Sequence, residues 1–350
     1  MPQNPLGDRE LPALTLPGTA VPLSLLDLAI IAPGETVAQS LAGCVALAQT
    51  AEIHGYRRVW YAEHHNMASI ASSAPAVLIA HIATQTRTIR LGAGGIMLPN
   101  HAPLTIAEQF GMLEALHPGR IDLGLGRAPG TDPTTTRALR RNHTSSDSFP
   151  EDVLELQAFL SEDSRIPNVE ATPGKGANVP LYILGSSTFG AELAAQYGLP
   201  FAFASHFAPH ALHEAIARYR GGYRPSERHP EPYVFAAVNV VAADTTEAAR
   251  AHFHASQRMM VKVLVGRGLS LSDDDADAIL ESPGGAQIRQ MGKYTAVGTG
   301  PEVQSYLEDF ASKTGANELI LSFRVPPLAA RLHAVALVAD RCRAAASHAA

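Results

Sequence analysis

The sequence predicts an α/β protein that folds as a (β/α)8 barrel. Short β-branched apolar runs alternate with longer segments of helical period, which indicates repeated βα units and a parallel sheet. Eight such runs occur, the number that a (β/α)8 barrel needs. The chain has 350 residues, a length that such barrels use as one unit. A doubly wound sheet is the alternative architecture.

The eight expected strands share a short length and a β-branched or apolar composition. They are Leu25 to Ile31, Arg58 to Ala62, Ile89 to Leu98, Ile121 to Gly126, Leu181 to Gly185, Phe201 to Ser205, Tyr233 to Ala242 and Glu318 to Phe323. Segments of helical period lie between them, such as Thr36 to His54 and Pro103 to Leu116.

Helix boundary residues agree with this alternation. Thr36 can cap the first helix through its hydroxyl, and Gly55 can end that helix just before a strand. Ser72 or Ser73 precedes Pro75, a residue that is favoured in the first turn of a helix. Local chemistry and hydrophobic period therefore predict the same elements.

Two stretches do not fit a minimal barrel, and we expect them to be insertions after strands four and seven. The first, Arg127 to Phe149, is polar and rich in threonine, and the second, Gly266 to Lys293, contains the acidic run SDDDAD. Residues 1–22 are rich in proline and are expected to form an N-terminal arm. Residues 23–350 are then a single barrel domain that carries these two insertions.

Composition limits the function classes. Hydrophobic residues make up 46% of the chain and charged residues 17%, so it can bury a sizeable core. A formal charge of −6 disfavours nucleic acid as a partner. Cys44 and Cys342 offer neither a disulfide framework nor zinc spacing, and each is expected to be a core residue. No run approaches the roughly 18 apolar residues of a membrane span, so we expect a cytoplasmic protein without a membrane partner.

Active sites of such barrels are built from the loops after the strands, and four of these loops are rich in polar residues or glycine. They read AEHHNMASIASSAP, LPNHAP, GLGRAPGTDPTTTRALRR and GSSTFGAELAAQYGLP. The expected strands six and seven end in plainer sequence. A ligand held by the first five strands is therefore expected.

The loop after the fifth expected strand has the features of a phosphate site. Ser186, Ser187 and Thr188 place hydroxyls and free N–H groups at a helix N-terminus. Arg137, in the first insertion, could grip a phosphate with two parallel hydrogen bonds. The same residues are also compatible with an ordinary serine or threonine cap and a solvated surface arginine.

Adjacent histidines follow the second expected strand. A metal site at Glu63, His64 and His65 is disfavoured, because neighbouring side chains at a strand end point apart and no HxH or HExxH occurs. A histidine here suits a hydrogen-bond donor or a general acid or base, and one of the pair can be structural. A nucleophilic hydrolase is also disfavoured, since there is no GxSxG and neither cysteine lies on a loop.

The third expected strand carries glycines at Gly92, Gly94 and Gly95. Glycine in a strand interior gives up packing and backbone order, so this density indicates an unusual dihedral or a group lying close to the backbone.

Read together, these loops resemble the flavin-dependent luciferase-like monooxygenases, the family of bacterial luciferase. The resemblance covers most of residues 23–325. The motifs that carry it, in chain order, are WYAEHHN, GAGGIMLPNHAPLTIAEQF, HPGRIDLGLGRAPGTD followed by RAL, ILGSSTFGAELAAQYGLPFAFA and VGTGPEVQSYLEDFASKTGANELILSF.

This resemblance implies that the barrel of residues 23–350 binds reduced FMN, which reacts with O2 to a flavin C4a-peroxide that oxidises an organic substrate. It implies a catalytic role for His64 and a place beside the flavin for Arg127. It assigns the phosphate to Arg137 and to Ser186 and Ser187. The family's non-proline cis peptide beneath the isoalloxazine falls on Gly94 and Gly95, with Gly92 easing the approach.

The sequence also departs from bacterial luciferase. The reactive cysteine before the strand-four arginine is replaced by Gly126, and the glutamate of the phosphate loop aligns with Gly185 or Ser186. The stretch between Arg127 and Arg137 is shorter than in luciferase. Light emission is therefore not expected.

The resulting hypothesis is an FMN-dependent oxidoreductase, a two-component monooxygenase that receives FMNH2 from a separate flavin reductase. Its substrates would be O2 and a fairly apolar small organic molecule, with no resident metal, and a homodimer is expected from the family. A second hypothesis is a coenzyme F420-dependent oxidoreductase, although no basic pocket for an oligoglutamate tail is evident. A non-catalytic flavin-binding subunit and a metal-dependent barrel hydrolase are two further hypotheses.

Overall fold

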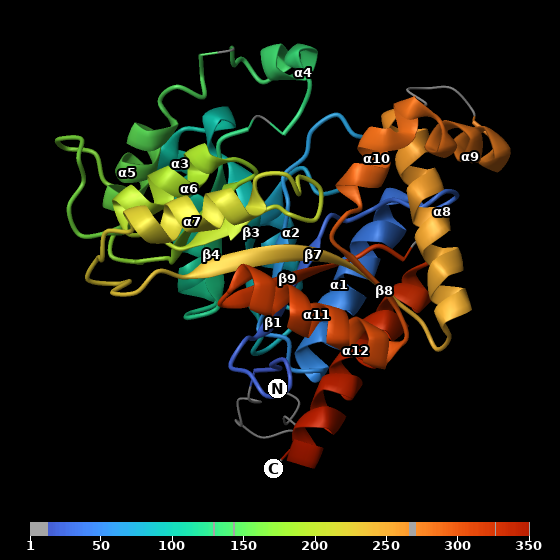
Figure 1. The fold of residues 1–350 in the computed structure, drawn as a ribbon. Coiled ribbons are helices and arrows are strands. Elements are labelled where there is room, and N and C mark those ends of the chain that lie inside the picture. The colour runs from blue at the N-terminus through green and yellow to red at the C-terminus, as the bar shows by residue number, and fades with distance from the viewer. Residues whose placement is uncertain (1–12, 129, 143, 266–270, 326, 350) are drawn as a thin grey trace.

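Eight parallel strands close into a barrel, which confirms the predicted architecture (Figure 1). The structure is a computed structural model that describes residues 13–128, 130–142, 144–265, 271–325 and 327–349. Hydrogen bonding follows the order β1, β2, β3, β4, β5, β6, β7 and β9, and β9 pairs with β1 to close the barrel.

The strands are short and largely buried. Their bounds are β1 Leu23–Asp27, β2 Arg58–Tyr61, β3 Arg90–Met97, β4 Ile121–Gly126, β5 Leu181–Gly185, β6 Phe201–Phe203, β7 Val234–Ala242, β8 Thr295–Gly298 and β9 Glu318–Phe323.

The sequence did not predict β8, which lies outside the closed barrel. This strand pairs only with the second half of β7, from Asn239 opposite Thr295 to Ala242 opposite Gly298. It is four residues long and follows a polar insertion, so it has too few residues to show a strand period.

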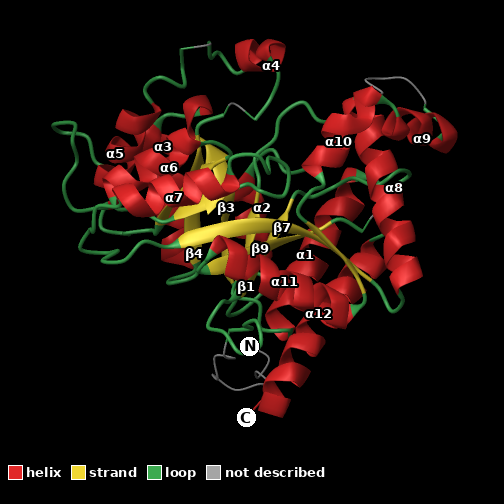
Figure 2. Ribbon diagram, in the orientation of Figure 1, coloured by secondary structure: helices red, strands yellow, loops and turns green. Residues whose placement is uncertain are grey.

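The helices cover the outside of the barrel, as Figure 2 shows. Their bounds are α1 Val37–Ile53, α2 Pro75–Ala83, η1 Leu98–Asn100, α3 Pro103–Leu116, α4 Pro133–Ala138, α5 Phe149–Leu160, α6 Thr188–Tyr197, α7 Leu212–Gly222, α8 Thr246–Leu264, α9 Asp273–Glu281, η2 Pro283–Gly285, α10 Ala286–Met291, α11 Gly300–Thr314 and α12 Leu328–Ala349. None of the helices in the described ranges is both long and apolar enough to span a bilayer.

The first strand ends four residues earlier than expected. The apolar run continues to Ile31, but Asp27 Oδ1 accepts a hydrogen bond from the backbone N–H of Ala29 at 2.9 Å, and Ala29 has a φ of 50°. Ile30 then forms an isolated antiparallel bridge with Ile70. This turn diverts the apolar run out of the sheet and toward the end of the barrel.

The cap prediction at α1 is confirmed, and α2 begins at Pro75 as predicted. Thr36 forms a capping box with Gln39, and Gly55 follows α1 with a φ of 74°. At α2 the N-cap is Ala74, which has no side chain to cap with. Ser72 instead donates its hydroxyl to the carbonyl oxygen of Ala62 and ties this loop to the end of β2.

The core lies between the helices and the outer face of the barrel, and it includes Cys44 and Cys342, both buried as expected. A second cluster fills the barrel interior with the rings of Trp60, Tyr182 and Phe235. Trp60 also lines a cavity on the side of the carboxyl ends of the strands.

The two expected insertions contain short helices. The first holds α4, which lies at the top of the view in Figure 1, apart from the other helices. The second holds α9 and α10, although residues 266–270 of it lie outside the described residues. Residues 1–12 of the expected N-terminal arm also lie outside them, whereas Leu14 and Leu16 are buried against the core. The domain boundaries remain a prediction.

Candidate active site

A cavity of about 810 Å³ opens at the carboxyl ends of the barrel strands. This is the size of a pocket that encloses a cofactor-sized ligand. Most of its wall is apolar, and one side comes from α8 and from α10 of the second insertion, whose apolar residues lie side by side in the lining. The residues of that side are Phe253, Met259, Met260, Val263, Leu264, Ile288 and Met291.

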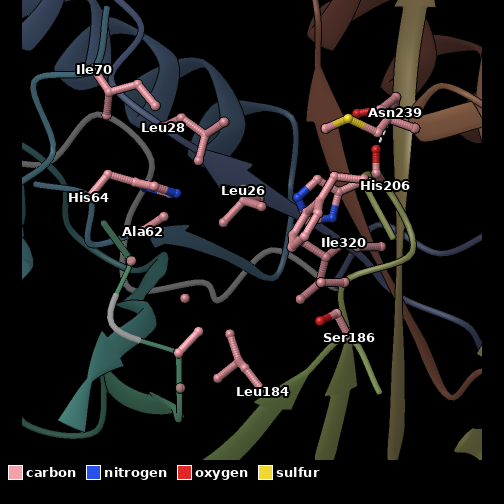
Figure 3. A pocket seen from close by; sticks show the side chains of 18 of the residues that line it. Leu26, Leu28, Ala62, His64, Ile70, Leu184, Ser186, His206, Asn239 and Ile320 are labelled. Carbon is pink, nitrogen blue, oxygen red and sulfur yellow. Dashed lines mark hydrogen bonds between the residues drawn. The ribbon is translucent and has the colours of Figure 1, made fainter. Parts of the chain in front are cut away.

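His64 reaches into this cavity from the end of β2 (Figure 3). Its backbone N–H donates to the carbonyl oxygen of Ser72 at 2.9 Å, while its Nδ1 atom is buried without a hydrogen-bond partner. Burial lowers the pKa of His64, and the charge of Arg324 lowers it further. The imidazole is therefore neutral at pH 7 and can donate or accept one hydrogen bond.

His65 points away from the cavity and contacts Glu63, with 2.8 Å between Nε2 and Oε1. Of the two histidines, only His64 lines the cavity, in line with the expectation that they point apart. Within the part of the chain that the structure describes, no three histidine, cysteine or acidic residues are arranged to hold a metal ion.

Glu63 connects β2 to the end of β3. Its carboxylate accepts the backbone N–H of Met97 at 2.9 Å and contacts the Nε2 atom of His101 at 2.9 Å, besides His65. Asn100 donates to the same carboxylate at 3.2 Å. Burial alone would raise the pKa of Glu63, but the hydrogen bonds from His101, His65 and Met97 lower it below its usual value.

The peptide bond between Gly94 and Gly95 is cis, as predicted. Gly94 lines the cavity and Gly95 does not. A Cβ atom on Gly94 would lie 2.8 Å from the Cβ of Trp60, and one on Gly95 would lie 2.7 Å from the carbonyl oxygen of Gly124. Both glycines are therefore required by packing inside the barrel, whatever lies above them.

The structure gives a different reason for a glycine at position 92 from the one expected. A Cβ atom there would lie 2.6 Å from the Cβ of Asp122 and 2.9 Å from the ring of Trp60. The absence of a side chain lets the indole of Trp60 cross β3 and donate to Asp122 at 3.1 Å.

Ser186 and Ser187 lie at the start of α6, on the rim of the cavity. Ser187 is the N-cap residue of α6, yet its side chain makes no capping hydrogen bond. Thr188 is the first residue of the helix and does not line the cavity. The hydroxyl of Ser187 is thus not used in the way that an ordinary cap would use it.

The structure brings one of the two expected arginines to the cavity. Arg127 lines it, with its guanidinium 4.1 Å from the ring centre of Phe189 in α6. Arg137 lies on α4, is exposed and donates only a weak hydrogen bond to Thr134 at 3.5 Å. It does not line the cavity, so its phosphate role remains a prediction.

Sequence reasoning missed several polar residues of the cavity, and three of them lie in or after β6, β7 and β9, whose sequences are largely apolar. These three are His206 after β6, Asn239 in β7 and Arg324 after β9. Burial, together with the charge of Arg324, lowers the pKa of His206 to about 3. Burial lowers the pKa of Arg324 to about 10, so its guanidinium is still charged at pH 7. The only sequence cue was a lone polar residue after an apolar strand.

A closed parallel barrel with a cavity at its strand ends is typical of an enzyme. The family model described as luciferase-like monooxygenase matches residues 23–315. The chain belongs to the luciferase-like monooxygenase family, and its relatives support an oxidoreductase of the monooxygenase class.

Two relatives and one solved structure are similar over most of the chain. A luciferase-like monooxygenase of Escherichia coli K12 is 43% identical over 91% of this chain and 96% of its own length. The N-acetyl-S-alkylcysteine monooxygenase of Bacillus subtilis is 39% identical over 74% of this chain and 79% of its own. The crystal structure of apo-MsnO8 has 34% identity and a TM-score of 0.83, and the match covers 92% of this chain and 98% of that one.

More distant structures share the fold alone. The oxygenating constituent of 3,6-diketocamphane monooxygenase from Pseudomonas putida, in complex with FMN, has a TM-score of 0.70 at 16% identity, covering 92% of this chain and 98% of that one. The coenzyme F420-dependent tetrahydromethanopterin reductase of Methanopyrus kandleri has a TM-score of 0.65 at 15% identity, with the same coverage.

Proposed function

We propose that the protein is an FMN-dependent monooxygenase of the two-component kind. It takes FMNH2 from a separate flavin reductase and uses O2 to oxidise an apolar organic substrate. The observation that carries this proposal is the helix N-terminus at the rim of an apolar cavity, where the hydroxyl of Ser187 is not engaged as a cap.

The residues present fit FMN. A phosphate at the start of α6 would accept hydrogen bonds from the hydroxyls of Ser186 and Ser187 and from free backbone N–H groups, with the helix dipole favouring its charge. Arg127, on the same rim, adds a positive charge. The isoalloxazine would then lie in the apolar part of the cavity, against the backbone of Gly94.

The bound flavin would supply the activation of O2. The protein would contribute exclusion of water by the apolar wall and a proton relay at His64. A neutral imidazole whose Nδ1 has no protein partner can hold or release a proton at that atom. The carbonyl of Ser72, bonded to the backbone of His64, keeps the ring at the cavity wall.

The test is a titration of the purified protein with FMN, riboflavin and coenzyme F420, each in its oxidised and reduced form. FMN should bind more tightly than riboflavin, because only FMN carries the phosphate, and F420 should bind more weakly than either. Oxygen uptake by the FMNH2 complex then tests the reaction. Tighter binding of F420, or no binding of either form of FMN above buffer controls, would overturn the proposal.

A double change of Ser186 and Ser187 to alanine isolates the phosphate contacts. It should weaken FMN by at least about 100-fold, because two hydrogen bonds to a charged group contribute about 3–6 kcal/mol together, and leave riboflavin unchanged. The matched control is Ser164→Ala, which removes a loop hydroxyl outside the cavity. Equal losses for FMN and riboflavin would contradict the phosphate role.

A further inference from the structure

Arg324 places a positive charge in the wall of a largely apolar cavity. It follows β9 directly, and its backbone N–H donates to the carbonyl oxygen of Val240 at 3.1 Å. Its side chain makes one hydrogen bond, from Nε to Oδ1 of Asn239 at 3.1 Å. Among the residues that the structure describes, no carboxylate forms an ion pair with it.

Arg58, inside the barrel, is a buried arginine whose charge is compensated by carboxylates, and it serves as a comparison for Arg324. Arg58 is bound by Asp122, with N and O atoms 2.7 Å apart, and by Glu318 at 2.9 Å. Both carboxylates raise the pKa of Arg58, whereas burial alone acts on Arg324. Arg324 is half-buried in the cavity wall, and a guanidinium partly removed from water is costly unless an anion compensates it.

The neighbours of Arg324 do not supply that anion. His64 and His206 lie close enough for its charge to lower the pKa of both, and both are neutral at pH 7. Figure 3 shows these two imidazoles on opposite sides of the cavity. Two carboxylates line the cavity. That of Glu63 is occupied by His65 and His101, and Asp147 is exposed and forms no ion pair with Arg324 among the described residues.

Asn239 holds the guanidinium in position. Its Oδ1 accepts from Arg324, and its Nδ2 donates to the backbone carbonyl oxygen of His206 at 2.6 Å. Its amide is therefore oriented from both ends, and it holds the Nε atom of Arg324, a residue that lines the cavity. Asn239 acts as a positioning residue for the charge.

We propose that Arg324 binds an anionic group of the substrate, a carboxylate or an oxyanion of similar size. The rest of the substrate would lie against the apolar wall of α8 and α10, which includes Met260 and Met291. The inference rests on the proposed function and adds to it a substrate class, an apolar organic acid. The phosphate of FMN is not the anion meant, because α6 follows β5, and β6 and β7 separate β5 from β9 in the barrel.

The experiment compares octanoate with 1-octanol as probes of equal chain length. Each is titrated into the FMN-loaded protein, and binding is followed by calorimetry and by the flavin absorbance. Octanoate should bind at least about tenfold more tightly than octanol, as a charge-assisted hydrogen bond predicts. Arg324→Gln should abolish this preference, Arg324→Lys should keep part of it, and FMN affinity should stay unchanged in both variants.

The matched control is Arg250→Gln, an exposed arginine near the start of α8 that does not line the cavity, and it should keep the full preference. Thermal melting distinguishes a structural role, because Arg324 has no ion pair to lose and the Tm of Arg324→Gln should not fall. Equal binding of octanoate and octanol by the unchanged protein would overturn the inference. So would a preference that survives in Arg324→Gln, or a loss of FMN affinity there.

The outcome also separates this inference from the proposed function. If FMN does not bind, the proposed function fails, and the same two probes are titrated into the ligand-free protein. An octanoate preference that depends on Arg324 then still supports the anion site. If FMN binds but octanoate shows no preference, only the anion site fails.

Discussion

Glu63→Gln is expected to destabilise the protein strongly, because one buried carboxylate serves several donors. Its side chain is fully buried, with an exposed fraction of 0%. It accepts from His65, His101 and Asn100 and from the backbone of Met97. Glutamine offers a single acceptor oxygen and places an NH2 group against some of these donors.

The expected loss is about 3–5 kcal/mol of unfolding free energy, the range for breaking a buried charged network from one side. Urea denaturation at pH 7 measures it. The control is Glu227→Gln, an exposed glutamate for which the structure gives no hydrogen bond, and it should stay within about 0.5 kcal/mol of the parent protein.

The lowered pKa of Glu63 makes the free energy of unfolding depend on pH. A carboxyl whose pKa is lower in the folded than in the unfolded protein stabilises the fold at pH values above its unfolded pKa. That contribution is lost as the pH falls through the folded pKa. The difference in unfolding free energy between Glu63→Gln and the parent protein should therefore be largest at pH 7 and should shrink below about pH 4.3. A variant within about 0.5 kcal/mol of the parent at pH 7 would refute the assigned role of this network.

Four further substitutions test the remaining assignments. Arg137→Ala should weaken FMN far more than riboflavin in the titration, and equal losses would refute a phosphate role for α4. Gly111→Ala should lower the unfolding free energy by about 1–3 kcal/mol, because the new Cβ atom would meet the backbone of Gly174. Gly221→Ala should raise the unfolding free energy by about 0.5–1 kcal/mol, since nothing lies within 4 Å of the new Cβ atom. Arg58→Met should cost about 3–5 kcal/mol in the same denaturation assay, because two buried carboxylates lose their partner, and a smaller loss than for Gly111→Ala would contradict that role.

Most of the barrel could be predicted from hydrophobic period, because each of its eight strands is buried and each is followed by a segment of helical period. The errors fall where a local interaction overrides that period. The apolar run after Leu25 stays apolar through Ile31, but the hydrogen bond from Ala29 to Asp27 turns it out of the sheet. The strand β8 exists because β7 extends past the barrel and offers a free edge, which no property of β8 itself reveals.

Some residues of the candidate site could be predicted from the sequence, and others could not. His64 and Ser187 could be predicted because each lies in a polar loop whose local pattern already suggests a site. His206, Asn239 and Arg324 could not, because each is a single polar residue in an apolar context. Their relation arises only when β6, β7 and β9 lie side by side, which places the carbonyl of His206, the amide of Asn239 and the guanidinium of Arg324 in one chain of hydrogen bonds.

Glycines of β3 and β4 form part of the cavity wall. The interior of a (β/α)8 barrel is ordinarily filled by layers of large side chains. Here the lower part is filled by the ring of Trp60 and its neighbours, whereas Gly94 and Gly126, nearer the carboxyl ends, contribute no side chains to the interior. A Cβ atom on Gly126 would already lie 2.7 Å from the methyl group of Met97. Gly94 and Gly126 therefore line the cavity with backbone alone, because Trp60 and Met97 occupy the space that a side chain would need.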